Sequence, residues 1–202
     1  VEIARRLGAR VISQDPAALD ADGRIKDYAG VRNACSAAAS HDWLLHLDAD
    51  EYTSPELRGE LGRAVATGTH AVFWVPRKYV LDGSVIEHSV SYPNRQIRFF
   101  HRAATKGFRK PIHERVEPLP GVAAELLRSP ILVPIDLSRE AQSAKTDRYI
   151  AIELDRQSPI SAGTCWRIVR GSLKVSLLYA LRFARMLLPP YAGARMPLAR
   201  DM

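Results

Sequence analysis

The sequence predicts an α/β domain with a mostly parallel sheet flanked by helices, followed by a C-terminal helical extension. Over residues 1–76, stretches with helical periodicity alternate with short apolar stretches, an order that favours a parallel sheet. Over residues 77–102 the pattern changes to short strands separated by turn residues, which indicates an antiparallel addition. After about residue 138 only helical patterns follow. We therefore place the α/β domain at residues 1–138 and the extension at residues 139–202.

Periodicity and capping residues predict the first elements in order. Residues 1–7 have helical spacing with Gly8 as the C-cap, and residues 10–13 form a short strand. Because a helix enters a strand so early, we expect a further strand to precede Val1 in the natural protein. An Ala-rich helix is expected at about residues 28–39, and residues 43–47 are typical of a buried strand.

The next elements are predicted by turn chemistry as well as by apolar spacing. Ser54 as N-cap and Pro55 at the first helical position start a helix that reaches about Ala66. Residues 70–76 form the next strand. The Asp82-Gly83 pair predicts a turn, and residues 95–101 alternate as a strand does.

Charge is distributed unevenly along the chain. Of the 29 Lys and Arg residues, eight lie between Arg156 and Arg200, a stretch that contains no acidic residue. All of the 22 Asp and Glu residues except Asp201 lie in the first 155 residues, where 21 basic and 21 acidic side chains cancel. This neutral body with a basic tail indicates an anionic partner for the tail. Since the body is neutral and shows no basic groove interleaved with aromatic residues, we expect no nucleic-acid partner.

The C-terminal extension is predicted to contain helices at residues 139–155 and 167–188, and the second of these lies in the basic tail. Five basic residues of the second helix fall within about 120° of one another on a helical wheel: Arg167, Arg170, Lys174, Arg182 and Arg185. A helix of this kind can bind an anionic membrane surface, although it can equally pack on the α/β domain with a solvated basic face. The longest apolar stretch, Val175 to Leu181, is far shorter than the roughly twenty residues of a spanning helix. We therefore expect a cytoplasmic protein that is peripheral on the inner face of the cell membrane.

The cysteine and histidine spacings exclude several metal sites. Cys35 and Cys165 form neither a disulfide framework nor a Cys-x-x-Cys knuckle, which indicates a reducing compartment or two buried thiols. No pair of histidines has the His-x-x-x-His spacing of a helical zinc site, so we expect no zinc.

Acidic residues follow the predicted strand at residues 43–47. Asp48, Asp50 and Glu51 lie at its carboxyl end, where open α/β sheets bind their ligands. Because alternate residues of an extended chain point to the same side, Asp48 and Asp50 can share a divalent cation and its phosphate ligands. Oxygen ligands of this kind suit Mg²⁺ or Mn²⁺. The alternative is an acidic turn that caps the following helix.

Two sequence blocks carry a resemblance to a known family. Residues 42–51 (Asp-Trp-Leu-Leu-His-Leu-Asp-Ala-Asp-Glu) are similar to the D-W-[hydrophobic]-L-x-L-D-A-D-E block of family-2 glycosyltransferases, which have the GT-A fold. Residues 32–35 (Arg-Asn-Ala-Cys) are similar to the preceding R-N-x-A segment, with Ala in the third place. Residues 98–116, which contain Gly107-Phe108 and His113-Glu114, resemble a later segment of the lipopolysaccharide core-type β-glycosyltransferases. The resemblance covers about residues 1–117, and it implies that a strand and a nucleotide-binding turn precede Val1 in the natural protein.

The resemblance implies transfer of a sugar from a nucleotide-sugar donor to an envelope glycolipid or polysaccharide, with inversion at the sugar. By this resemblance Asp50 is the direct ligand of Mg²⁺ or Mn²⁺, Asp48 contacts the ribose or the metal, and Arg32 lies near the base or the diphosphate. Inversion also needs a base that takes the acceptor proton. Glu114 is the candidate, with His113 orienting the acceptor or tuning the carboxylate.

Alternative interpretations remain open at this point. Asp82 and Glu87 are weaker candidates for the base, and residues 113–115 can be a solvated turn with a local ion pair. A nucleotidyltransferase also uses paired aspartates and a metal on an α/β sheet. A non-catalytic, membrane-associated binding module of the same fold is a further possibility.

Overall fold

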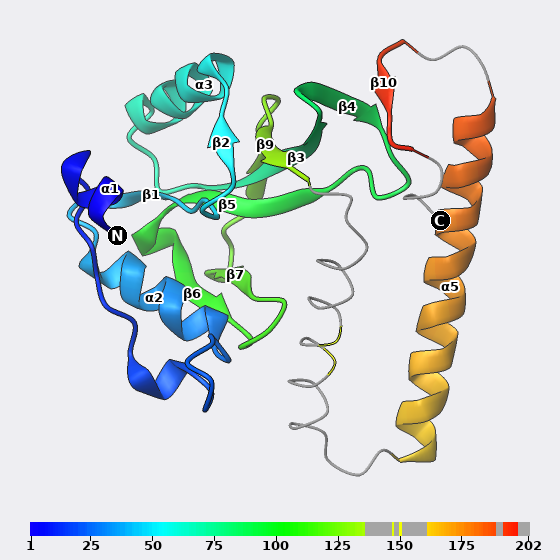
Figure 1. Ribbon diagram of the computed structural model, residues 1–202, viewed down its shortest axis with the longest axis horizontal. Helices are drawn as coiled ribbons and strands as arrows, with labels where there is room; N and C mark the ends of the chain where they lie inside the picture. Colours follow the sequence, from blue (N-terminus) through cyan, green and yellow to red (C-terminus); the bar gives the residue numbers. More distant parts are fainter. Residues whose placement is uncertain (136–146, 148–149, 151–160, 189–191, 198–202) are drawn as a thin grey trace. The chain divides into compact units, whose positions relative to one another are not determined.

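The computed structural model describes residues 1–135, 147, 150, 161–188 and 192–197. Its helices are α1 (Glu2–Arg6), α2 (Tyr28–Ala38), α3 (Pro55–Ala66) and α5 (Ala162–Leu187), with 3-10 turns η1 (Pro16–Ala18) and η2 (Arg102–Ala104). Its strands are β1 (Trp43–Leu45), β2 (Tyr52–Thr53), β3 (Val72–Leu81), β4 (Ser84–His88), β5 (Arg95–His101), β6 (Thr105–Arg109), β7 (Arg115–Pro118), β8 (Ala124–Leu126), β9 (Ile131–Pro134) and β10 (Ala194–Arg195) (Figure 1).

The chain divides into two compact units. Unit 1 comprises Val1–His46, Gly68–Phe73 and Ile97–Glu125, and unit 2 comprises Leu47–Thr67, Trp74–Gln96 and Leu126–Met202. Strands β3 and β5 contribute residues to both units.

The expectation of a mostly parallel, GT-A-like sheet flanked by helices is wrong. The larger sheet has the strand order β1-β5-β3-β4-β10, with β8 and β9 paired to β3 and β2 paired to β9. The β1–β5, β3–β4 and β2–β9 pairs are antiparallel, as is the separate β6–β7 pair, whereas β3–β9 and β4–β10 are parallel. A parallel neighbour needs a long crossover, but after β3 the chain returns through short turns. The described architecture is therefore mixed α/β with a mostly antiparallel sheet.

Unit 1 has an apolar core between α2, β1, β5 and the β6–β7 pair. The buried residues of this cluster include Ala29 on α2, Leu44 on β1, Phe100 on β5 and Phe108 on β6. Asp27 caps α2 by accepting a hydrogen bond from the Gly30 amide at 3.0 Å. This core fixes α2 against the hairpin of β6 and β7, so residues far apart in the sequence can form one site.

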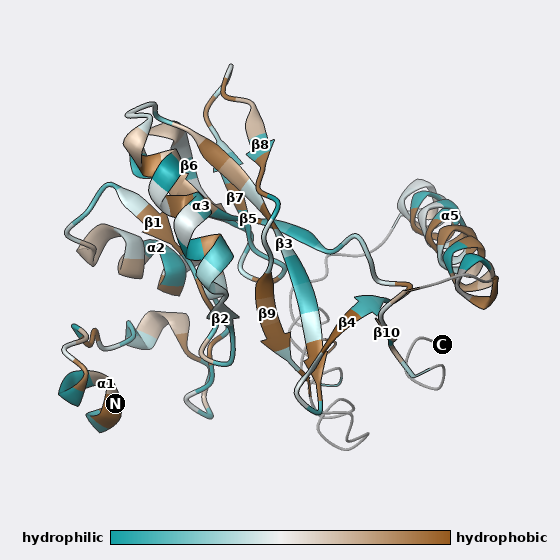
Figure 2. Cartoon of the chain, turned by 90° about the horizontal axis from the view of Figure 1, so that it is seen from above, coloured by the Kyte–Doolittle hydropathy of each residue, from teal (hydrophilic) through white to brown (hydrophobic). Residues whose placement is uncertain are grey.

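Unit 2 packs α3 and β9 around fully buried apolar side chains. Leu57 of α3, Val75 of β3 and Ile131 of β9 are completely covered, and β9 is one of the most apolar segments of the chain (Figure 2). Glu60 of α3 accepts hydrogen bonds at 2.9 Å from the amides of Arg128 and Ser129. Burial alone would raise the pKa of Glu60, but these two amides lower it overall. Hydrogen bonds to the Glu60 carboxylate therefore hold the helix to the segment before β9, in addition to apolar packing.

Several predicted elements are confirmed by the structure. Helix α3 begins at Pro55 with the Ser54 hydroxyl accepting from the Leu57 amide at 3.2 Å. The Asp82-Gly83 turn joins β3 to β4 with positive φ angles of 49° and 77°. The strand expected at residues 10–13 is wrong, because these residues are exposed and pair with no strand in the described part of the chain. Apolar spacing alone does not make a strand without a neighbour to bond to.

The second tail helix is confirmed as α5, which begins earlier than expected. The Ser161 hydroxyl accepts from the Thr164 amide at 3.2 Å and so starts the helix at Ala162. The helix predicted at residues 139–155, apart from Asp147 and Ile150, and the border expected at residue 138 lie outside the described residues. In the described part of the chain, no helix has both the length and the apolar character that crossing a membrane requires.

Candidate functional site

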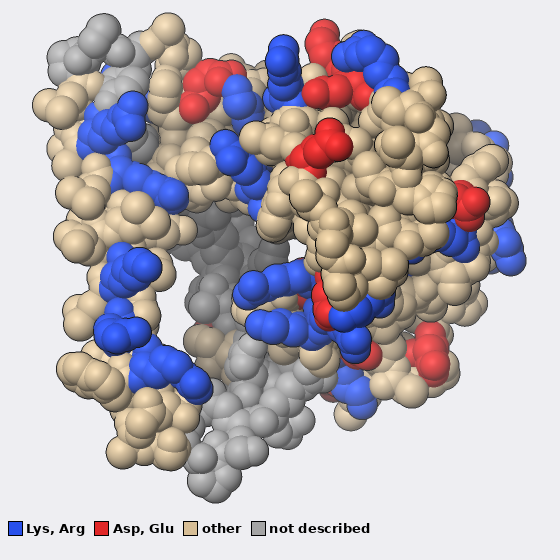
Figure 3. All heavy atoms as spheres, turned by 180° about the vertical axis from the view of Figure 1, so that it is seen from behind, with Lys and Arg blue, Asp and Glu red and all other residues tan. Residues whose placement is uncertain are grey.

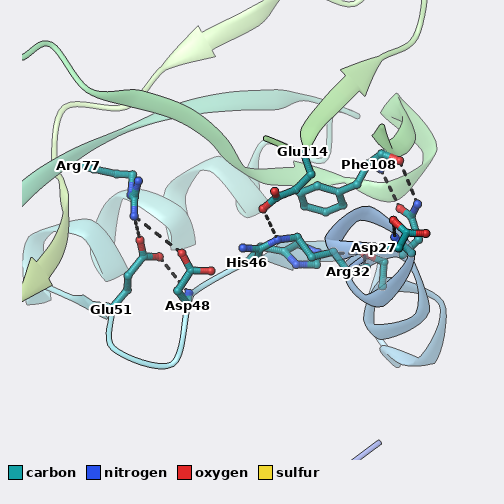
Figure 4. Close-up of polar contacts among 11 residues, drawn as sticks. Asp27, Arg32, His46, Asp48, Glu51, Arg77, Phe108 and Glu114 are labelled. Atoms are coloured by element: carbon teal, nitrogen blue, oxygen red, sulfur yellow. Dashed lines mark hydrogen bonds and ion pairs between the residues drawn. The ribbon is translucent and has the colours of Figure 1, made fainter. Parts of the chain in front are cut away.

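The acidic turn after β1 is anchored by Glu51. Its side chain is completely buried, with 0% of its surface exposed, and its Oε1 atom accepts a hydrogen bond from Nη2 of Arg77 (Figure 4). Its Oε2 atom accepts from the Asp48 amide at 3.0 Å, and the Glu51 amide donates back to the Asp48 carbonyl at the same distance. Asp48 and Glu51 thus close the turn on each other, and Arg77 neutralises the buried carboxylate. All three residues belong to unit 2.

The two aspartates of the turn have different surroundings. The Asp48 carboxylate lies 3.8 Å from Nη2 of Arg77 and is about one-third exposed, so the same guanidinium faces both Asp48 and Glu51. Asp50 is exposed at the tip of the turn. Asp50 is therefore the carboxylate of this turn that is most accessible to a ligand from solvent.

The turn fits a metal ion that arrives with phosphate groups better than one held by protein alone. Among the described residues, no group of three or more His, Cys, Asp or Glu side chains is placed to hold a metal ion. Mg²⁺ bound with nucleotide phosphates takes one or two carboxylates and completes its coordination with water and phosphate oxygens. Asp50 and Asp48, which are two positions apart in the sequence, can supply such carboxylates.

In unit 1 the structure brings together two of the predicted site residues, Arg32 and Glu114. Nε of Arg32 donates to Oε1 of Glu114 at 2.8 Å, and both side chains are mostly buried, at 15% and 17% exposure (Figure 4). The Arg32 guanidinium also lies over the Phe108 ring, 5.6 Å from its centroid. Arg32 comes from α2 and Glu114 from the loop between β6 and β7. Glu114 thus pairs with a residue 82 positions away in the sequence, whereas the alternative interpretation placed an ion pair within residues 113–115.

Backbone contacts hold the Glu114 loop against α2. Asn33 accepts from the Phe108 amide at 2.8 Å and donates to the Phe108 carbonyl at 3.0 Å. The Tyr28 amide donates to the Pro111 carbonyl at 2.9 Å. The Arg32-Asn33 pair therefore has two functions: Arg32 binds the Glu114 carboxylate while Asn33 fixes the strand that leads to it.

His46 is part of this cluster although its sequence spacing indicated no role. Its ring stacks on Phe100 with centroids 5.6 Å apart and meets Phe108 edge-on at 4.7 Å. Nε2 of His46 lies 2.9 Å from the Ser36 hydroxyl, which itself donates to the Arg32 carbonyl. Because the Ser36 hydroxyl hydrogen is used in the bond to Arg32, Nε2 of His46 carries a hydrogen and donates to the Ser36 oxygen. A single histidine in a strand gives no motif, so only its packing reveals its place beside Arg32.

The remaining candidates occupy more exposed positions. His113 is exposed with a φ of 52°, in the left-handed region that non-glycine residues rarely adopt. Asp82 is exposed in the β3–β4 turn, and Glu87 on β4 forms an ion pair with Lys78. Cys35 and Cys165 are free and exposed, which corrects the expectation of buried thiols.

Helix α5 presents apolar and basic side chains together at its surface. Trp166, Leu173 and Leu177 are all more than 60% exposed. Its five basic residues have no acidic residue among them, and they form a row along the helix in Figure 3. Apolar groups are also exposed on the basic side of the helix, where Leu178 and Leu181 lie. The helix therefore differs from one with a single, sharply bounded apolar face.

The predicted site residues thus belong to separate polar clusters, with Asp48 and Asp50 in the acidic turn of unit 2 and Arg32 and Glu114 paired in unit 1. The sequence motifs pointed to both clusters. No known protein-family model matches the chain. The resemblance to family-2 glycosyltransferases therefore stays a prediction that depends on the motifs themselves.

Proposed function

We propose that this protein is an inverting, metal-dependent glycosyltransferase that moves a sugar from a nucleotide-sugar donor to an envelope glycolipid or polysaccharide. The observation that carries the proposal is the acidic turn, in which a buried Glu51 anchors the backbone through Arg77 and leaves Asp50 exposed. An anchored turn holds its exposed carboxylate in place before the ligand arrives, which lowers the entropic cost of binding.

In this proposal Asp50 and Asp48 hold a Mg²⁺ or Mn²⁺ ion together with the donor diphosphate. When bound, the ion supplies positive charge that stabilises the departing nucleoside diphosphate. Asp50 contributes its exposed carboxylate, and Asp48 a carboxylate that also faces Arg77. Because the turn lacks a third side-chain ligand among the described residues, we expect metal affinity to be low until the nucleotide is present.

Glu114 is the proposed base for the acceptor hydroxyl. Its carboxylate takes the hydroxyl proton while the acceptor oxygen bonds to the anomeric carbon from the face opposite the diphosphate. The bond from that carbon to the diphosphate oxygen breaks, and its electron pair leaves with the nucleotide. Arg32 orients the carboxylate through one oxygen at 2.8 Å, and the other oxygen, Oε2, is the one we assign to the acceptor. His113, which precedes Glu114 in the sequence, is proposed to contact the acceptor as well.

The proposed place of action is the inner face of the cell membrane, with α5 as the membrane contact. The exposed apolar side chains of α5 can enter the headgroup region while its five basic residues bind anionic lipid. An acceptor that is itself embedded in the membrane makes such a contact useful, because it raises the local concentration of the acceptor.

The donor site is tested by isothermal titration of the full chain with UDP, with Mn²⁺, and with both together. We expect binding of the pair to exceed binding of either alone, and Asp50→Asn to weaken it at least tenfold. Asp82→Asn removes an exposed aspartate from the same unit and serves as the matched control. Equal binding by wild type and Asp50→Asn would remove the metal role of the turn.

The reaction class is tested by following a radiolabelled nucleotide sugar in the presence of membrane glycolipid. A glycosyltransferase releases nucleoside diphosphate and labels the lipid, whereas a nucleotidyltransferase exchanges pyrophosphate, and a binding module does neither. Glu114→Gln should abolish transfer yet keep donor binding, and Glu87→Gln, the weaker candidate, should keep transfer. The reverse result would move the base to Glu87.

A further inference from the structure

Unit 2 contains an open groove of about 880 Å³ whose described lining shares only Arg77 with the residues that form the acidic turn. Its volume lies within the usual range for ligand sites. Six cationic side chains line the groove: Arg77, Lys78, Arg95, Arg128, Arg182 and Arg185. Glu87 is the only acidic residue among its described lining residues. The groove is therefore strongly positive before any pairing is considered.

Pairing within the protein neutralises only part of this charge. Arg77 is matched by Glu51, and Lys78 by Glu87. Arg182 donates to the neutral carbonyl of Val90 at 3.2 Å. In the described residues, no carboxylate pairs with the guanidinium groups of the three remaining arginines, Arg95, Arg128 and Arg185. Like charges gathered in one groove repel each other, so an anionic ligand would lower the free energy of this arrangement.

Arg77 connects the groove to the acidic turn. It lines the groove, and it also bonds to Glu51 and faces Asp48. Its Nε atom is buried and has no hydrogen-bond partner among the described residues. A ligand in the groove therefore lies next to the turn to which we assign the donor diphosphate.

We propose that this groove binds phosphate groups carried by the acceptor saccharide, so that the acceptor is an anionic, phosphorylated sugar rather than a neutral one. The proposal rests on the proposed function, because it assigns the groove to the acceptor. Arginine is suited to the task, since its planar guanidinium binds a phosphate through two parallel hydrogen bonds. A neutral sugar would leave Arg95, Arg128 and Arg185 unmatched.

The test is isothermal titration of the full chain with glucose 1,6-bisphosphate and with uncharged glucose, in metal-free buffer containing EDTA. We expect the bisphosphate to bind and glucose not to bind. Arg95→Gln/Arg128→Gln should weaken bisphosphate binding at least tenfold. Arg58→Gln/Arg63→Gln, which removes two exposed arginines of α3 from the same unit, is the matched control and should leave binding within about twofold of wild type. The buffer holds no divalent metal and the titration uses no nucleotide, so this result is independent of the donor-site test.

Three results would overturn the proposal. The first is that the wild type does not bind the bisphosphate. The second is that both arginine-to-glutamine double variants lose bisphosphate binding equally. The third is that Arg95→Gln/Arg128→Gln keeps bisphosphate binding and loses only binding to vesicles of phosphatidylcholine with phosphatidylglycerol. The second result would indicate a general field effect, and the third a lipid-headgroup site. Arg95→Lys/Arg128→Lys keeps the charge without the two-pronged geometry, so an intermediate loss in this variant supports arginine-specific phosphate contact even if the Gln variant folds poorly.

Discussion

Replacing Arg77 by Met should destabilise unit 2 more than any surface change and loosen the acidic turn at the same time. The Glu51 side chain is 0% exposed and the Arg77 side chain 14% exposed, so water cannot replace the lost guanidinium without opening the structure. Removing one partner of a buried ion pair typically costs about 3–5 kcal/mol. For a chain of this length each kcal/mol lowers Tm by roughly 2–4 °C, which gives a drop of about 6–20 °C.

The double variant Arg77→Met/Glu51→Leu separates the loss of the ion pair from the loss of the hydrogen bond that closes the turn. Because it removes both charges, its free energy of unfolding should return to within about 2 kcal/mol of wild type. Its turn should nevertheless stay loose, since a leucine side chain cannot accept the hydrogen bond that Glu51 accepts from the Asp48 amide at 3.0 Å in the native chain. UDP and Mn²⁺ binding should therefore remain weak in a variant whose stability has recovered.

Urea denaturation followed by far-UV circular dichroism gives these free energies, with Arg58→Met on the surface of α3 as the control. We expect the control to change stability by less than about 0.5 kcal/mol. If Arg77→Met unfolds within about 1 kcal/mol of wild type, the Glu51 carboxylate is not held by Arg77 and the turn is not anchored in the way described above.

Three further predictions concern unit 1 and the tail. Gly107→Ala should cost more stability than Gly121→Ala, as measured by urea denaturation. Both glycines have φ near +80°, but only at Gly107 would the new Cβ lie 2.7 Å from Oδ1 of Asn33. Equal losses of stability in the two variants would contradict this role of Asn33. The pKa of His101 is lowered by burial and then by the neighbouring His70, so the folded chain keeps this ring neutral. The unfolded chain takes up that proton first, and stability should fall as the pH drops from about 6.5 through the folded-state value. His101→Asn should flatten this dependence in urea midpoints measured between pH 7.5 and 5, and an unchanged slope would assign it to other groups. Replacing the five basic residues of α5 by Gln should reduce flotation with anionic vesicles at least tenfold, and equal flotation would reject α5 as the membrane contact.

Much of the local structure could be predicted because it depends on neighbouring residues. The Ser54-Pro55 start of α3 is a hydrogen bond across three residues, and the Asp82-Gly83 turn needs only residues that tolerate positive φ. The alternating strand at residues 95–101 is confirmed as β5 with its predicted bounds. Motifs predict Arg32, Asp48, Asp50 and Glu114 as site residues, and the roles of these residues stay predictions.

Local sequence patterns predict the helices α1, α2, α3 and α5, the strands β1, β3 and β5 and the position of the acidic turn, because capping, turn geometry and apolar periodicity act within a few residues. The antiparallel pairing of β5 with β1, the Arg32–Glu114 ion pair and the burial of Glu51 emerge only in the folded chain. These outcomes depend on contacts between residues tens of positions apart. Such contacts form only when the apolar side chains within each unit are buried, so no local pattern specifies them.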